Sequence, residues 1–447
     1  MKNQTTKLPL PPGPKWHDAF TTNLSPSEYI VNLQRKFGDV VRFRGLFFPV
    51  YMLTNPEYVK EILTKSWPEF TKRTLDYKIV SSVLGNGLVT NDGEFWKKQR
   101  RLMQPVFSHK SMNQFAPVIS SLASDMVNEW KTYESGKVVW LDQEMSRVTF
   151  KVVSRTLFGT NIDHVADEMI EILELTNQNP FRIKSLFRLT PNLPLPGNRT
   201  FKRVKARLNE IVDTLVAERK GIENGNDIVD RLIAARGMDS EGNMSDVQIR
   251  DEIITLMLAG HETSATALSW TFYLLSKNRK VEQQLREEIK EKLKGENPTH
   301  KTIQDLPYLK QVVQEAMRLY PPVPAFARKS EEETSFAGFR IPADSYIAIS
   351  IYALHRHPDF WRNPEEFNPD RFISSEAHSR HSYSFLPFSA GPRACIGAGM
   401  AMLEIQLILA ALIQRFTVTP LENHPVEALQ VVTLKQKYGL PATIKEI

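Results

Sequence analysis

The stretch Phe388-Ser-Ala-Gly391-Pro-Arg393-Ala-Cys395-Ile-Gly397 contains the single cysteine of this 447-residue chain. A lone cysteine cannot form an intrachain disulfide or complete a four-cysteine zinc or iron–sulfur site. Gly391-Pro392 predicts a tight turn, and the segment 396–415, rich in Ala, Leu and Ile, predicts a helix. Cys395 would then lie at a helix N-terminus, where free N–H groups and the helix dipole stabilise a thiolate. Such a thiolate suits either a metal ligand or a nucleophile.

The composition is that of an ordinary globular protein, with 41% hydrophobic and 24% charged residues. Neither repeats nor low-complexity linkers divide the chain, so we expect one domain over residues 1–447, with 1–24 as an extended proline-rich lead-in. A single cysteine fits a reducing compartment. The net charge of +6 is spread thinly, which argues against nucleic acid binding. The polar N-terminus and the absence of a run of ~20 apolar residues predict a cytoplasmic protein without a membrane anchor.

Hydrophobic periodicity predicts a mainly α protein with small β-sheets. Helices are expected over 25–37, 56–63, 93–107, 111–133, 141–158, 166–177, 199–224, 227–236, 246–277, 308–320 and 396–415, and strands over 40–54, 326–351 and 418–447. Residues 67–92 are predicted to be irregular, and 178–198 are a candidate substrate-access loop. The longest helix, 246–277, opens with a capping box at Ser245 and Gln248 and is apolar on nearly all sides, so it should be buried.

Polar residues interrupt that apolar helix at Ala259-Gly260-His261-Glu262-Thr263-Ser264. Gly260 could make room beside the helix, and Thr263 could bond back to a carbonyl and open a groove. Glu262 and Thr263 could then deliver protons to a ligand in the groove. Alternatively, these polar groups only satisfy neighbouring carbonyls, with His261 packed in the interior. The residues alone leave both interpretations open.

Glu315 and Arg318 lie three residues apart on one face of the helix expected over 308–320. An exposed Glu–Arg pair contributes little to stability, whereas a buried pair needs further partners. Arg371 is the candidate third member of such a buried group.

Together these segments resemble the cytochrome P-450 family of haem-thiolate monooxygenases, in a bacterial-type, single-domain form. Phe388, Gly391, Arg393, Cys395 and Gly397 fill the family pattern F-x-x-G-x-R-x-C-x-G. Four further matches follow the family's order: Trp96-x-x-x-Arg100, Ala259-Gly260-x-Glu262-Thr263, Glu315-x-x-Arg318 and Pro369-x-Arg371-Phe372. The resemblance implies the cytochrome P-450 fold, with the long buried helix lying over a haem.

The resemblance also implies roles for individual residues. Cys395 would ligate the iron of haem b, with Phe388, Gly391 and Gly397 around it. The haem propionates would be held by Trp96, Arg100, Arg328 and Arg393, since carboxylates favour charge-assisted donors. Ala259 and Gly260 would border the haem, while Glu262 and Thr263 deliver protons. The substrate pocket would include Val323, Ala325, Phe326 and Leu434, and Glu315, Arg318 and Arg371 would be structural.

The implied function is a haem-dependent monooxygenase that takes O2 as co-substrate and acts on an apolar substrate such as a fatty acid, a terpene or another lipid-like molecule. Too few residues follow Cys395 for a fused reductase. Electrons should therefore come from NAD(P)H through a ferredoxin- or flavodoxin-type donor with its own reductase. Lys97, Lys98 and Arg101 are candidate docking charges for an acidic donor. We expect a monomer.

Three alternative functions compete with this interpretation. The first is a thiol hydrolase or phosphatase that uses Cys395 as nucleophile. A phosphatase loop would need an arginine six residues later, but that position is Ala401, and nothing in the sequence specifies a histidine partner for a Cys–His enzyme. A haem-thiolate sensor or carrier would not need the pair Glu262-Thr263. A peroxide-driven peroxygenase of the same family typically lacks that pair, so its presence favours O2 and electrons.

Overall fold

The structure, a computed structural model, describes residues 8–15, 25–45, 48–159, 168–172, 196–219, 227–234 and 244–447. Most of the expected helix over 166–177 and nearly all of the candidate access loop over 178–198 lie outside these ranges. The proline-rich lead-in is described only over 8–15. There, the carbonyls of Pro9 and Pro12 accept N–H groups of Arg340 and Arg42. This part of the lead-in therefore lies along the strands that contain those two residues.

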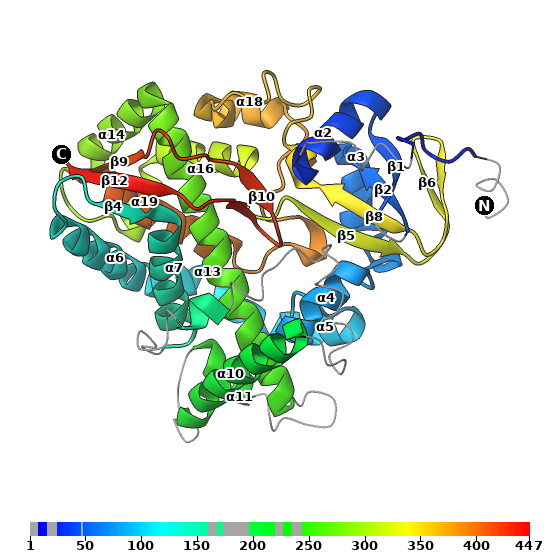
Figure 1. Cartoon of the computed structure of the whole chain (residues 1–447), viewed down its shortest axis with the longest axis horizontal. Coiled ribbons are helices and arrows are strands. Elements are labelled where there is room, and N and C mark those ends of the chain that lie inside the picture. The colour runs from blue at the N-terminus through cyan, green and yellow to red at the C-terminus, as the bar shows by residue number, and fades with distance from the viewer. Residues whose placement is uncertain are drawn as a thin grey trace.

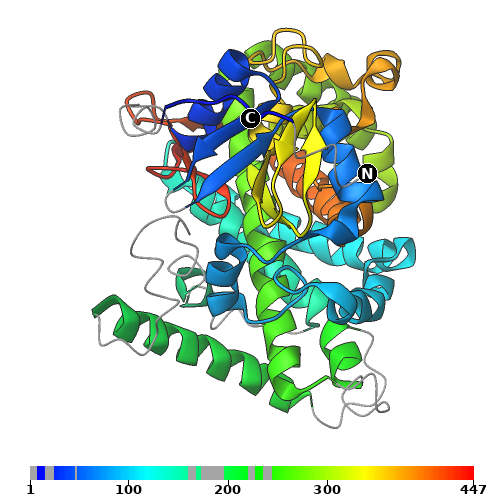
Figure 2. The ribbon, with the colours of Figure 1, turned by 90° about the vertical axis from the view of Figure 1, so that its right-hand side faces the viewer.

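Helix α13 (Asp246–Lys277) runs through the middle of the molecule (Figure 2) and begins at the predicted Ser245 capping box. Five helices share one large apolar core with it: α6 (His109–Lys131), α7 (Leu141–Leu157), α14 (Arg279–Leu293), α16 (Pro307–Leu319) and α19 (Ala398–Ile413). Figure 1 shows the largest sheet on one side of α13 and α6, α7, α14 and α19 on the other. The predicted class, mainly α with small sheets, is confirmed.

The largest sheet has five strands in the order β1-β2-β8-β5-β3. Its strands are β1 (Val40–Arg44), β2 (Pro49–Leu53), β3 (Phe70–Thr71), β5 (Ala325–Ser330) and β8 (Tyr346–Ser350). β1 and β2 form the predicted hairpin, with Val40 opposite Leu53, and only the β2–β8 pair is parallel. The smaller sheets contain β4 (Val138–Trp140), β12 (Pro441–Glu446) and β9 (Phe416–Pro420); β10 (Ala428–Gln430) and β11 (Leu434–Gln436); and β6 (Thr334–Phe336) and β7 (Phe339–Ile341).

The remaining helices are shorter or more peripheral. They are α2 (Pro26–Phe37), α3 (Pro56–Lys60), α4 (Leu75–Leu84), α5 (Gly93–Met103), α10 (Pro196–Glu218), α11 (Ile228–Ala234), α15 (His300–Gln304), α17 (Ile351–Leu354) and α18 (Ser374–Ser379). Within the ranges given above, the structure contains no helix with the length and apolarity needed to cross a bilayer.

The prediction that residues 67–92 are irregular is wrong. They contain a 3-10 turn at Trp67–Glu69, strand β3 and helix α4. The sequence of α4, LDYKIVSSVL, contains three β-branched residues and two serines, which have modest helix propensity. Because Ile79, Val83 and Leu84 are buried, tertiary packing decides the helix here. Helix α14 is a second element that the sequence analysis did not name.

Candidate functional site

The cysteine loop, residues 388–397, leads into helix α19. The N–H of Cys395 donates to the carbonyl of Phe388 at 2.9 Å, which closes the loop. Gly391 has φ of +69°, and a Cβ there would lie 1.9 Å from the carbonyl oxygen of Leu63. Both the positive φ and the close approach require glycine at this position. The predicted turn is therefore present, and the neighbouring chain holds it in place.

The thiol of Cys395 is exposed, but it faces an internal cavity and is otherwise enclosed by protein. Burial raises its pKa, while the N–H of Gly397 and the positive charge of Arg100 act in the opposite direction. The N-terminal position of the cysteine led us to expect a stabilised thiolate, but desolvation outweighs these two contributions. The surroundings of Cys395 therefore do not activate its free thiol as a nucleophile. A bound metal cation would deprotonate the thiol itself, so the site suits a metal ligand better than a nucleophile.

The cavity beside Cys395 has a volume of about 290 Å³, and most of its lining is apolar. Predicted site residues from four separate stretches of the chain meet around it: Trp96, Arg100, Ala259, Gly260, Thr263, Val323, Phe326, Phe388, Arg393, Cys395 and Gly397. The structure places the other predicted cofactor, proton and pocket residues outside this lining: Glu262, Ala325, Arg328, Gly391 and Leu434.

Two predicted arginines lie between α5 and the cysteine loop. Arg100 Nη1 donates to the carbonyl of Ala394 at 2.6 Å. The guanidinium of Arg393 lies 3.7 Å above the ring of Trp96 and also donates to the carboxylate of Asp92. Burial lowers the pKa of Arg393 to about 10, while Asp92 acts in the opposite direction.

Two residues near these arginines were missed by the sequence analysis. Lys72 lines the cavity and donates to the carbonyl of Val89 at 2.8 Å. The hydroxyl of Tyr77 accepts a hydrogen bond from Arg328 at 3.3 Å. Burial lowers the pKa of Lys72 well below its usual value, and the positive charges of Arg328 and Arg393 lower it further. No sequence signal marked Lys72, because a lysine in a segment predicted to be irregular is ordinarily exposed.

These residues fit the carboxylates of a haem. Lys72, Arg100, Arg328 and Arg393 place four basic side chains close to one another beside the cavity. In the part of the chain that the structure describes, Asp92 is the only carboxylate paired with any of them. An enclosed excess of positive charge is stabilised by an anionic ligand. The thiol of Cys395 faces the same cavity and offers one ligand for iron.

Thr263 and Gly260 lie on α13, which remains α-helical throughout. Thr263 Oγ1 donates to the carbonyl of Ala259 at 2.8 Å, so the predicted bond is present, but it does not break the helix. The room left by Gly260 is used by α7, because a Cβ at Gly260 would lie 2.8 Å from Val153 Cγ2. The glycine thus permits close helix packing, and Ala259 and Thr263 border the cavity beside it.

Glu262 faces away from the cavity. Its Oε1 accepts a hydrogen bond from Thr433 Oγ1 at 2.8 Å and pairs with Lys435 Nζ at 2.9 Å. The structure therefore does not bring the carboxylate of Glu262 to the hydroxyl of Thr263, because consecutive helical residues point in different directions. His261 is buried with Nδ1 2.8 Å from a carbonyl one turn earlier, which agrees with the expected packing role.

Ser264 and Glu404 form a second polar pair that the sequence analysis did not single out. Both residues line the cavity, and Ser264 Oγ donates to Glu404 Oε2 at 2.7 Å. Burial raises the pKa of Glu404 to about 8, against the smaller effect of the Ser264 hydrogen bond. A glutamate inside the mostly apolar α19 was the available signal, since an unpaired buried charge is unfavourable. The pair places a protonatable carboxyl beside the cavity.

The predicted substrate-pocket residues separate into two groups. Val323 and Phe326 line the cavity. Leu434 lies elsewhere, with its side chain buried in a small separate core and its carbonyl accepting the Nε1–H of Trp270 at 2.6 Å. Ala325 begins β5 and does not reach the cavity lining.

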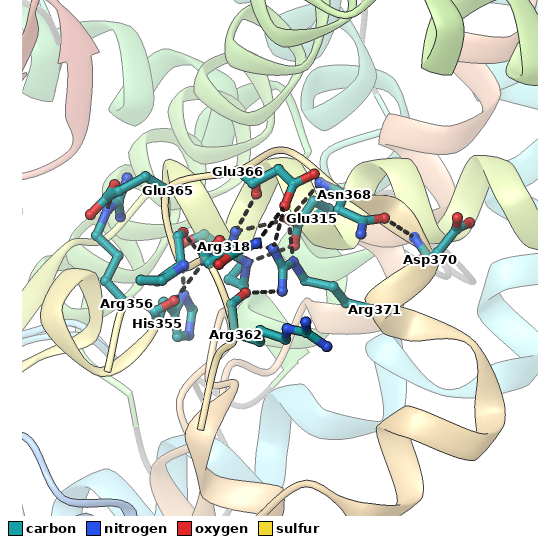
Figure 3. Close-up of polar contacts among 12 residues, drawn as sticks. Glu315, Arg318, His355, Arg356, Arg362, Glu365, Glu366, Asn368, Asp370 and Arg371 are labelled. Atoms are coloured by element: carbon teal, nitrogen blue, oxygen red, sulfur yellow. Dashed lines mark hydrogen bonds and ion pairs between the residues drawn. The ribbon is translucent and has the colours of Figure 1, made fainter. Parts of the chain in front are cut away.

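Glu315, Arg318 and Arg371 form a buried network (Figure 3). The carboxylate of Glu315 accepts hydrogen bonds from Arg318 Nε at 2.6 Å and Nη2 at 2.8 Å, and from Arg371 Nε at 3.2 Å. The remaining donors of Arg318 reach carbonyls at 2.7–2.9 Å: those of His355, Pro364 and Glu366. The network therefore joins α16 to the coil that precedes the cysteine loop.

Comparisons with known proteins agree on one family. The family model described as Cytochrome P450 matches residues 9–441. Similar proteins include “Cyclooctatin synthase” of Streptomyces melanosporofaciens, which is 34% identical over 89% of this chain and 86% of its own length. “Cyclooctat-9-en-7-ol 5-monooxygenase” of the same organism is 31% identical over 88% and 85%. “Cytokinin hydroxylase” of Arabidopsis thaliana is 32% identical over 89% and 79%. Among solved structures, “Crystal structure of cytochrome P450DA heme domain” matches with a TM-score of 0.86 and 25% identity, covering 98% of each chain.

Proposed function

The chain belongs to the cytochrome P450 family and is an enzyme of the monooxygenase kind, and from this premise we propose that it inserts one oxygen atom of O2 into an apolar, lipid-like substrate. The observation that supports this proposal best is that Cys395 and Thr263 border one largely apolar cavity. Haem, when bound to a cysteine thiolate, supplies the oxygen-activating chemistry of this family.

In this proposal the enzyme holds haem b through Cys395 and a set of donors. Cys395 provides the ligand to iron, and the N–H of Gly397 bonds to the sulfur and reduces its basicity. Phe388 lines the cavity together with Cys395, and Gly391 keeps the loop closed against Leu63. The haem carboxylates are bound by the indole and basic groups beside the cavity: Trp96, Arg100, Arg328, Arg393 and the additional Lys72.

Proton delivery is assigned to groups that face the cavity. Thr263 holds a proton at Oγ1, and Ser264 with Glu404 provides a second protonatable pair. Glu262, the acid expected from the sequence, acts instead as an anchor in this proposal, because its carboxylate binds Thr433 and Lys435 beside β11.

The proposed substrate is an unsaturated, lipid-like alcohol such as a terpene alcohol, with a fatty acid as the second class. The cavity wall supports an apolar substrate: Leu88, Val89, Leu157, Leu256, Ala267, Val323 and Phe326. One similar protein is named for its action on cyclooctat-9-en-7-ol, an unsaturated alcohol.

The enzyme depends on electrons from a redox partner. We assign this role to a ferredoxin- or flavodoxin-type donor that is reduced from NAD(P)H by its own reductase. The exposed basic residues of α5, Lys97, Lys98 and Arg101, are the proposed docking charges, although Lys97 also pairs with Glu94 at 2.6 Å. We further propose that the enzyme acts as a cytoplasmic monomer with a single haem domain.

A carbon monoxide spectrum tests the proposal. The reduced, haem-loaded protein should show the strongly red-shifted Soret band of a thiolate-ligated haem, and Cys395→Ala should abolish it. Thr263→Ala is a matched control, because it alters the cavity wall on α13 without touching the ligand. A band typical of histidine-ligated haem in the wild type, or failure to bind haem, would contradict the proposal.

A further inference from the structure

Residues 85–92 join α4 to α5 and form part of the cavity wall. Leu88 and Val89 line the cavity, and Leu88 is buried. This segment and α4 lie beside the N-terminal half of α13 (Figure 1). Thr255 and Ala259 of α13 line the cavity as well. The position of residues 85–92 relative to α13 therefore determines the width of the cavity between this segment and the helix.

Two consecutive carboxylates of α13 bind the main chain of this segment. Asp251 Oδ2 accepts the N–H of Asn86 at 2.7 Å, and Glu252 Oε2 accepts the N–H of Leu88 at 2.9 Å. The N–H of Leu88 is buried, and leaving it without an acceptor is unfavourable. Both donors are main-chain groups, so these contacts depend on the acidic side chains of α13 and not on the side chains of Asn86 and Leu88.

Two glycines bring the segment into direct contact with α13. A Cβ on Gly85 would lie 2.0 Å from Cγ of Asp251, and a Cβ on Gly87 would lie 2.1 Å from Oγ1 of Thr255. Gly85 also has φ of +67°. The turn therefore packs directly against the side chains of Asp251 and Thr255, which lie one helical turn apart on α13.

Glu252 is an unusual residue for this position. It is fully buried, and its Oε1 has no hydrogen-bond partner among the described residues, nor does Oγ1 of the neighbouring Thr255. Leaving such groups unsatisfied is unfavourable. An apolar residue would avoid this cost, so the contact with the N–H of Leu88 is the property that distinguishes a glutamate here.

We propose that Asp251 and Glu252 are positioning residues that clamp residues 85–88 onto α13 and thereby determine the size of substrate that the cavity admits. This inference rests on the proposed function, in which the cavity binds substrate beside the haem. Loss of the clamp releases Leu88 and Val89 from α13 and widens the cavity. Bulky ligands then gain affinity, whereas ligands too small to touch the wall do not.

Hydrogen–deuterium exchange of the haem-loaded protein tests the clamp directly. Asp251→Ala should speed exchange of the Asn86 amide, and Glu252→Leu that of the Leu88 amide, each by roughly tenfold. Glu252→Gln keeps an acceptor oxygen and should retain protection at Leu88. Glu288→Leu is the matched control, because the Glu288 carboxylate accepts two backbone N–H groups, at 2.8 and 2.9 Å, away from the cavity.

Spectral titration with two azoles tests the consequence for specificity. Imidazole is small enough to reach the haem without touching Leu88, whereas clotrimazole must fill the cavity. Glu252→Leu should raise the affinity for clotrimazole relative to imidazole by roughly tenfold, a difference that corresponds to about 1.4 kcal/mol. A residue with only a structural role, as in Glu288→Leu, should leave this ratio unchanged.

A second route covers the case in which Glu252→Leu fails to fold. Gly87→Ala introduces a Cβ that meets Thr255 and should displace the same turn, with the same changes in exchange and in azole ratio. Unchanged exchange and an unchanged ratio in the folded variants would overturn the clamp. If the wild-type protein binds neither azole, the result contradicts the proposed function instead. The amide exchange rates of Asn86 and Leu88 still show whether Asp251 and Glu252 hold residues 85–88 on α13.

Discussion

Thr263 and Glu262 are adjacent in the chain, yet their side chains serve different parts of the molecule. Thr263 borders the cavity and bonds to a carbonyl of its own helix, whereas Glu262 reaches away from the cavity to Thr433 and Lys435. At the scale of single residues, the direction of a side chain on α13 therefore decides whether it can take part in chemistry.

Thr263→Ala should lower the yield of product per electron pair by roughly tenfold or more, because the cavity loses a proton-holding group. The electrons should appear as hydrogen peroxide. The measurement compares NAD(P)H consumed with product formed, using cyclooctat-9-en-7-ol as probe substrate and a surrogate ferredoxin with its reductase. Glu262→Gln is the matched variant and should stay within about twofold of wild type. A loss of coupling in Glu262→Gln but not in Thr263→Ala would reverse the assignment.

Individual site residues were predictable to different degrees. Cys395, Trp96, Arg100 and Arg393 stand in spaced patterns, and all four border the cavity. Lys72 could not be found, because only the folded chain brings it beside the arginines. The resemblance implied a pocket position for Leu434, but the fold directs its side chain into a separate small core.

At the scale of elements, α13 and α19 each carry a buried glutamate among apolar residues. Burial raises the pKa of both Glu252 and Glu404 to about 8. Each carboxyl is therefore neutral in the folded protein over a pH range in which it is ionised in the unfolded chain. Burying each carboxyl is unfavourable, but it places Glu252 of α13 against residues 85–88 and Glu404 of α19 beside the cavity.

The pH dependence of stability follows from these two groups. Their favourable contribution is complete below about pH 4.5 and is lost as pH rises through about 8, because the unfolded chain releases protons first. Each group should lower the unfolding free energy by about 1.4 kcal/mol per pH unit within this window. Unfolding free energies, measured with denaturant at several pH values between 5 and 8, should fall less steeply with pH in Glu404→Gln than in wild type. Glu94→Gln, on the surface, should leave this pH dependence unchanged. An unchanged pH dependence in Glu404→Gln would contradict the raised pKa of Glu404.

On the scale of the whole molecule, one histidine connects the buried ion network to the residues just before the cysteine loop. His355 is fully buried, with Nδ1 3.2 Å from the carbonyl of Arg318 and Nε2 accepting the N–H of Leu386 at 2.9 Å. Burial, with the charge of Arg318, lowers its pKa to about 3. The ring is therefore neutral and can donate from one nitrogen while it accepts at the other.

His355→Phe should weaken this connection. It leaves the Leu386 N–H and the Arg318 carbonyl without their partners, so the unfolding free energy should fall by ~2–4 kcal/mol. The carbon monoxide spectrum should also show a smaller share of the thiolate-type band, because the loop before Cys395 loses an anchor. His357→Phe is the matched control, since His357 is equally buried but pairs with Asp39. It should destabilise the protein without changing the band, and equal spectra for both variants would refute the connection.

The hydrophobic periodicity of the sequence, with its capping and turn residues, by itself determined the class of fold, the bounds of α13 and the identity of the cysteine loop. These features are local, since apolar spacing, capping residues and turn glycines act within a few residues along the chain. Only the tertiary structure decided that α4 is a helix, that Glu262 faces β11 and that Lys72 and Glu404 meet the cavity. Those outcomes depend on contacts between segments distant in sequence, where burial and side-chain direction override local preference.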